Sequence, residues 1–110
     1  MPVLEDIKIL EKYLKSDGVD YFAEQAIKKL ISHTLQREQK DLDEITDELR
    51  SYENKYDMNS DEFHKRFHQG ELNDSEDFFV WDAALEMRNR IAARIAILMG
   101  RSKSDAKSSN

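Results

Sequence analysis

The sequence predicts an all-α fold, because helix-breaking residues are scarce and apolar residues recur at helical spacing. The 110 residues include one proline, at position 2, and three glycines, at positions 18, 70 and 100. The stretches between the glycines are rich in Glu, Lys, Leu, Arg, Ala and Gln, which favour helices. No segment shows the alternating apolar pattern that is typical of strands. We therefore expect four helices in a single domain over residues 1–100.

A short first helix is expected over residues 3–15. Its apolar residues share one helical face, and they are Val3, Leu4, Ile7, Leu10 and Leu14. The helix should end at Ser16 and Asp17, with Gly18 in the left-handed conformation that closes many helices. An isolated helix this short is marginal, so we expect it to dock on another surface.

A long second helix is expected over about residues 19–56. In its second half the apolar spacing narrows to the threes and fours of a coiled-coil seam, formed by Leu42, Ile45, Leu49, Tyr52 and Tyr56. About 38 helical residues would span about 57 Å, whereas a compact domain of this size has a radius of gyration near 13 Å. The helix should therefore either break near residues 33–41 or project and pair through this seam in an elongated homodimer.

A third helix is expected to begin at Asn59, with Glu62 placed three residues later for a reciprocal cap. Met58 before the cap and Phe63 inside the helix have the spacing of a hydrophobic staple. Gly70 should end this helix.

The fourth helix should be capped by Asp74 or Ser75 and run to about Met99, with an apolar face wide enough to make it central to the core. Residues 101–110 have no apolar anchor beyond one alanine, and we expect a disordered tail.

The net charge of −6 comes from 23 acidic and 17 basic residues, which makes general nucleic-acid binding unfavourable. Residues 71–86 carry six acids and no base. Phe79 lies off the apolar face of the fourth helix, so we expect it to be reserved for another chain. The residues predicted to bind a protein partner are Glu71, Asp74, Glu76, Asp77, Phe79 and Asp82.

The absence of cysteine excludes disulfides, thiolate metal sites and a cysteine nucleophile. The N-terminus carries Glu5 and Asp6 and lacks the apolar stretch of a signal peptide. No apolar run approaches the roughly 20 residues that span a bilayer. We expect a soluble cytoplasmic protein.

Two other classes of function stay open. The first is a metal enzyme that uses His64 and His68, four residues apart on one helix, with Glu71 one turn on. Lys65 follows the first histidine where zinc peptidases have a glutamate, so we expect no catalytic residue, metal or cofactor. The second is a dimeric DNA-binding regulator, whose basic residues would be Lys28, Lys29, Arg37 and Lys40.

Residues 52–81 resemble a pattern in small archaeal and bacterial proteins. In that pattern a Glu/Lys-rich helix precedes a Tyr-Gly-Met-Ser-Ser-Glu-Glu-Phe-like entry, a Gly-Glu-Leu-Gly-Asp-like connector and an Asp-Phe…Trp helix. The corresponding segments here are Tyr56-Asp-Met58-Asn-Ser60-Asp-Glu62-Phe63, Gly70-Glu71-Leu72-Asn-Asp74 and Asp77-Phe78…Trp81. Asp57 and Asn73 replace the glycines of the pattern.

Such proteins resemble antitoxins of toxin–antitoxin pairs. The resemblance implies a non-catalytic protein that neutralises a toxin by covering its basic, RNA-facing surface with acidic helices.

Overall fold

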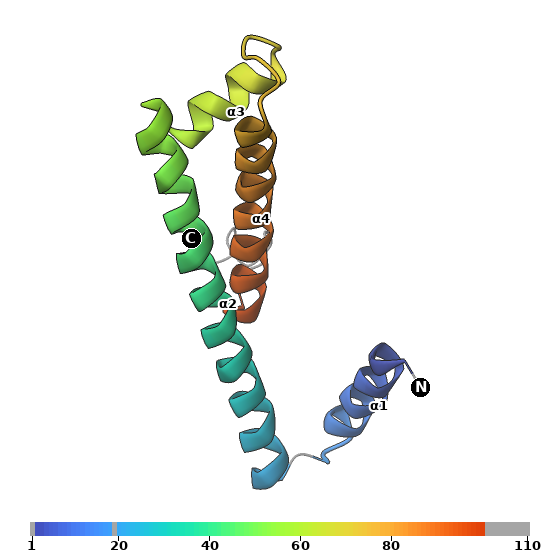
Figure 1. Cartoon of the computed structure of the whole chain (residues 1–110). Helices are drawn as coiled ribbons and strands as arrows, with labels where there is room; N and C mark the ends of the chain where they lie inside the picture. The colour runs from blue at the N-terminus through green and yellow to red at the C-terminus, as the bar shows by residue number, and fades with distance from the viewer. Residues whose placement is uncertain (1, 19, 101–110) are drawn as a thin grey trace, which may run out of the picture. The chain divides into compact units, whose positions relative to one another are not determined.

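The computed structural model describes residues 2–18 and 20–100, which contain four helices and no strand, so the all-α prediction is confirmed (Figure 1). The helices are α1 (Val3–Lys15), α2 (Tyr21–Tyr56), α3 (Ser60–His68) and α4 (Glu76–Leu98). The chain divides into two compact units, Met1–His33 and Thr34–Asn110. A single domain over residues 1–100 stays a prediction, and the expected tail at 101–110 lies outside the described residues.

In the first unit, α1 has the predicted bounds but ends differently from the prediction. Asp17, at φ 66°, takes the left-handed conformation that was expected of Gly18. The glycine is needed for another reason. A Cβ atom at position 18 would lie 2.5 Å from the ring of Tyr13 and 2.7 Å from its carbonyl oxygen. The turn therefore requires Gly18 because of the close approach to Tyr13.

Helix α2 runs unbroken through residues 33–41, so the predicted alternative of a break in this segment is wrong. The boundary between the two units falls inside the helix, between His33 and Thr34. This is the stretch in which the apolar pattern is weakest.

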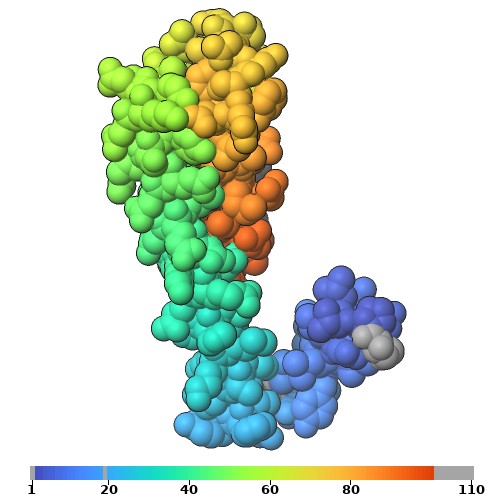
Figure 2. Space-filling model, in the orientation of Figure 1, coloured from blue at the N-terminus to red at the C-terminus, as the bar shows by residue number. Residues whose placement is uncertain are grey.

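In the second unit, α3 and α4 fold back on the second half of α2 and pack against it (Figures 1 and 2). Trp81, which is fully buried, stacks on Phe63 with 3.9 Å between ring centroids. The buried cluster around this pair consists of Leu49, Phe63, Phe78, Trp81, Ala84 and Leu85. Further along α4, Ile91 and Ile95 are also buried. The prediction that α4 is central to the core is therefore confirmed.

The turn before α3 follows the predicted cap in part: Asn59 caps the helix as predicted, whereas the described residues show no hydrogen bond from the Asn59 backbone N–H back to the Glu62 carboxylate. The Asn59 side chain accepts a hydrogen bond from the Glu62 backbone N–H at 2.8 Å. Glu53 of α2 accepts a second one from the Ser60 backbone N–H, also at 2.8 Å. Gly70, at φ 76°, has the left-handed conformation that ends the helix. These bonds satisfy backbone donors that the first turn of a helix leaves unpaired.

Of the two residues predicted to cap α4, the structure selects the serine. The hydroxyl oxygen of Ser75 accepts a hydrogen bond from the Phe78 backbone N–H at 3.2 Å. This cap fixes where α4 begins, and therefore which of its residues face α3.

Candidate functional site

The seam predicted for dimerisation packs within the chain. Tyr52 stacks on Trp81 at 5.7 Å between ring centroids, and Tyr56 meets Phe78 edge-on at 5.0 Å. Leu49 is buried in the same cluster, Ile45 packs against it, and Leu42 is half-buried. Helix α4 of the same chain therefore occupies the face that a second copy was expected to cover. Dimerisation through these residues stays a prediction.

The acidic residues predicted to bind a partner have different surroundings. Asp77 is half-buried and accepts hydrogen bonds from Lys55, at 2.6 Å, and from the hydroxyl of Tyr56. The hydrogen bonds from these two donors, Lys55 first, hold the pKa of Asp77 below its ordinary value. The same hydrogen bonds to Asp77 raise the pKa values of Lys55 and Tyr56. Asp77 thus joins α2 to α4. Its charge is already balanced by Lys55.

Glu71, Asp74 and Glu76 remain on the surface at or just before the start of α4, the helix that carries Phe79. Glu71 lies 3.7 Å from Arg66 in a solvent-exposed ion pair, and Asp74 and Glu76 are exposed. Phe79 is 56% exposed. The start of α4 therefore carries both an exposed apolar ring and exposed acidic groups.

The basic residues proposed for DNA binding are divided between the two units. Lys28 pairs with Glu24 at 2.9 Å and lies with Lys29 in the first unit, whereas Arg37 and Lys40 belong to the second.

One ion pair of the second unit was not anticipated. Arg94 donates to both carboxylate oxygens of the buried Glu38, at 2.6 and 3.3 Å, and these bonds lower the pKa of Glu38. They tie the C-terminal half of α4 to α2.

The first unit has a large exposed apolar surface that none of the predicted sites included. No residue of α1 is buried. Its large apolar side chains are between 43% and 69% exposed, and they are Val3, Leu4, Ile7, Ile9, Leu10 and Tyr13. Those at the start of α2 are between 42% and 81% exposed, and they are Tyr21, Phe22, Leu30 and Ile31. We call these ten residues the N-terminal apolar surface.

Part of this surface is hollowed. An open groove of about 450 Å³ runs between α1 and the first turns of α2 within the first unit. Its apolar lining consists of Ile7, Leu10, Leu14, Ile27 and Leu30. The apolar groove is open to solvent, which agrees with the expectation that α1 docks on another surface.

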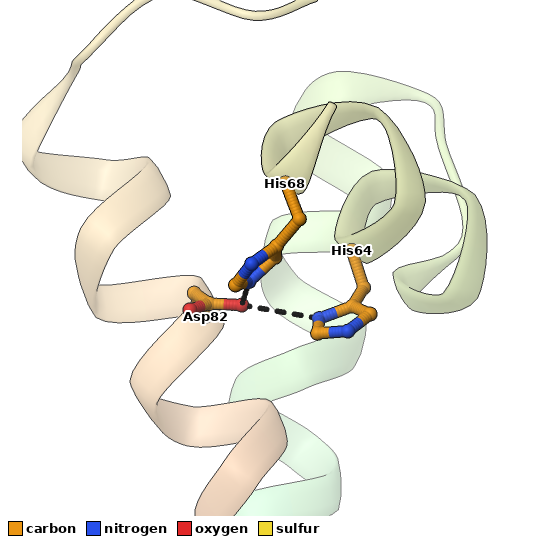
Figure 3. Close-up of side chains that lie close together, drawn as sticks. All are labelled: His64, His68 and Asp82. Carbon is orange, nitrogen blue, oxygen red and sulfur yellow. Dashed lines mark hydrogen bonds and ion pairs between the residues drawn. The ribbon is translucent and has the colours of Figure 1, made fainter. Parts of the chain in front are cut away.

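Two histidines of α3 meet an aspartate of α4 (Figure 3). The Asp82 carboxylate oxygen Oδ1 lies 3.2 Å from Nδ1 of His64 and 2.9 Å from Nε2 of His68. The structure therefore brings Asp82 to this pair, and Glu71 pairs elsewhere. Asp82 follows the buried Trp81 and lies at the edge of the face that α4 turns toward α3, and only the packing of these two helices shows that it meets the histidines.

No protein family model matches this sequence, and comparisons with curated proteins and with solved structures give no significant match. None of the described helices combines the length and the apolar character needed to cross a membrane.

Proposed function

We propose that this chain is a non-catalytic protein-binding protein that docks on a partner through the N-terminal apolar surface. The observation that carries the proposal is the exposure of ten large apolar side chains within one small unit. Soluble monomers rarely expose apolar patches of more than a few hundred Å², and larger ones mark interaction sites. A partner that fills the groove would remove three of these side chains, Ile7, Leu10 and Leu30, from water, and the burial of apolar surface favours the complex.

The charge of the second unit supports a partner with a basic surface. Residues 34–100 contain 16 acidic and 9 basic residues, a net charge of 9 − 16 = −7, and residues 101–110 bring the net charge of the whole unit to 12 − 17 = −5. Complementary charge speeds association and selects among partners. Together with the resemblance to antitoxins, this favours a toxin whose basic, RNA-facing surface is covered on binding. Its inhibition would be steric and electrostatic and would need no catalytic residue.

The test is co-expression with the product of the neighbouring gene. We expect a stable complex on size-exclusion chromatography and relief of any growth arrest that the neighbour causes alone. Ile7→Asp places a charge in the groove and should abolish the complex. Lys8→Asp adds an acid at the adjacent position outside the groove lining and should leave the complex intact.

Circular dichroism of both variants would check that the helices persist. The proposal fails if no complex forms with the unmodified chain and the toxicity of the neighbour is unchanged. It also fails if Ile7→Asp binds as well as Lys8→Asp.

A further inference from the structure

We propose that His64, His68 and Asp82 form a binding site for a divalent cation of the zinc class, a site independent of the partner surface. His64 and His68 are one turn apart on α3, and Asp82 faces both from α4 (Figure 3). One ligand atom of each residue lies within 4.8 Å of the other two. Two helices packed in the second unit thus present three ligands to a common point.

The distances suit a small tetrahedral ion. Zinc binds nitrogen and oxygen at about 2.0–2.2 Å, which places neighbouring ligand atoms of a tetrahedron about 3.4 Å apart. The separations between Asp82 and the two histidines, 3.2 and 2.9 Å, are within about half an ångström of that value. The binding nitrogens of the two histidines lie within 4.8 Å of each other, and rotation of the imidazoles to the tetrahedral spacing would admit the ion.

The ligand types select the class of metal. Two imidazoles and one carboxylate suit Zn²⁺, Co²⁺, Ni²⁺ or Cu²⁺, whereas Mg²⁺ and Ca²⁺ prefer sites made of oxygen alone. Three protein ligands leave a fourth tetrahedral position for water.

Binding requires a defined proton arrangement. His64 would use its Nδ1 lone pair and keep the proton on Nε2, whereas His68 would use Nε2 and keep the proton on Nδ1. A proton on either binding nitrogen, where it now faces Asp82, must leave or move to the other ring nitrogen before the metal enters. The ion then replaces the two hydrogen bonds to Asp82.

The surroundings hold the ligands in place. Asp82 is held on the long helix α4 beside the buried Trp81, and its side chain is only 17% exposed. The ring of His68 packs edge-on against Phe67 at 5.7 Å, and the two histidine rings are 4.3 Å apart. The imidazoles are about half exposed, so an ion can enter from solvent.

The test uses the full-length chain without an affinity tag, stripped of metal with a chelator. Titration calorimetry with zinc chloride is expected to show one ion per chain, and the Co²⁺ form should have the intense visible absorption of four-coordinate cobalt. His64→Gln, His68→Gln and Asp82→Asn should each weaken zinc binding by at least about tenfold. His33→Gln and Asp43→Asn change the same residue types on the exposed surface of α2 and should bind zinc as the unmodified chain does.

A measurement on the unmodified protein provides a second readout. Zinc should shift the NMR signals of the His64 and His68 rings and leave those of His33 in place, and magnesium should shift none. Equal zinc affinity in the cluster variants and the controls would overturn the proposal. Binding stoichiometry well below one, or a magnesium response equal to that of zinc, would do the same. None of these results bears on whether the N-terminal apolar surface binds a partner.

Discussion

The indole ring of Trp81 occupies the centre of the second unit, where it contacts aromatic rings from two other helices. It stacks on Phe63 of α3 and lies near Tyr52 and Tyr56 of α2. Its N–H donates to the hydroxyl of the buried Ser60 at 3.0 Å. A polar group removed from water therefore keeps a partner, which avoids the cost of burying it alone.

Replacing Ser60 by alanine should lower the free energy of unfolding by about 1–3 kcal/mol, because the indole N–H would be buried without a partner. Urea denaturation followed by circular dichroism measures this. Ser51→Ala, on the exposed surface of α2, is the matched control and should stay within about 0.5 kcal/mol. In a Trp81→Phe background the donor is absent, so Ser60→Ala should cost less. An equal cost in both backgrounds would refute the role of this bond.

The contacts of Asp77 predict how stability changes with pH. Hydrogen bonds from Lys55 and Tyr56 lower its pKa below the ordinary 3.8. A carboxylate with a lowered pKa contributes stability that is complete above the ordinary value and is lost as pH falls through the lowered one. Asp77→Asn should therefore melt at a lower temperature than the unmodified chain at pH 7, and the difference should shrink below about pH 4.

Thermal melts across this pH range check the prediction. Asp74→Asn removes an exposed charge three residues earlier and should melt like the unmodified chain at pH 7. A difference for Asp77→Asn that persists undiminished at pH 2 would count against the assignment.

At the scale of the helices, the turn residues decide where each element ends. The cap at Asn59 and the left-handed Gly70 were readable from the sequence, because each depends on a residue type at a fixed local position. The cap of α4 was narrowed only to Asp74 or Ser75. The choice between Asp17 and Gly18 was not readable, because both residue types tolerate the left-handed conformation. The close contact of Gly18 with Tyr13 is what distinguishes them.

The same contrast applies to the candidate sites. The spacing of Leu42 to Tyr56 correctly indicated a helix partner, but periodicity contains no information on whether that helix belongs to the same chain. The metal-like cluster needed the packing of α3 on α4, because Asp82 lies far from His64 in sequence. The i, i+4 histidine pair was visible, and its third member was not.

The left-handed residue between α2 and α3 gives a prediction at this scale. Asp57 has φ 51°, a conformation in which a side chain costs about 1–2 kcal/mol relative to glycine, somewhat less for aspartate. Asp57→Gly should therefore raise the free energy of unfolding by up to about 1 kcal/mol, and Asp57→Ala should lower it. Urea denaturation of both variants tests the order Gly, Asp, Ala. A more stable alanine variant would contradict it.

Considered as a whole molecule, the chain uses its apolar residues in two ways. The second unit buries many of them in one aromatic-rich cluster and leaves others, among them Phe79 and Ile97, exposed, whereas no apolar residue of α1 in the first unit is buried. The sequence predicted apolar stripes in both units. It did not indicate that the first stripe would stay exposed, because exposure depends on which elements the rest of the fold supplies.

The charge of residues 34–100 predicts the salt dependence of complex formation. If a basic partner is drawn in by the net charge of −7, raising the salt concentration from about 50 to 500 mM should slow association at least about tenfold. Surface plasmon resonance with the partner immobilised would measure the rate. A substitution in the apolar groove such as Ile7→Asp should instead act mainly on dissociation. An association rate independent of salt would remove charge from the proposed mechanism.

The buried position of Trp81 also determines which part of the chain tryptophan fluorescence can monitor. It is the single tryptophan of the chain, and it is shielded from water by stacked rings. Its fluorescence should therefore be blue-shifted in the native protein and move to the red when the second unit unfolds. The first unit has no tryptophan, so its partner-binding surface would be silent in such an experiment. Phe22 is 81% exposed, and Phe22→Trp would add a second fluorescent indole in the first unit. This indole would be shielded from water only when a partner covers it.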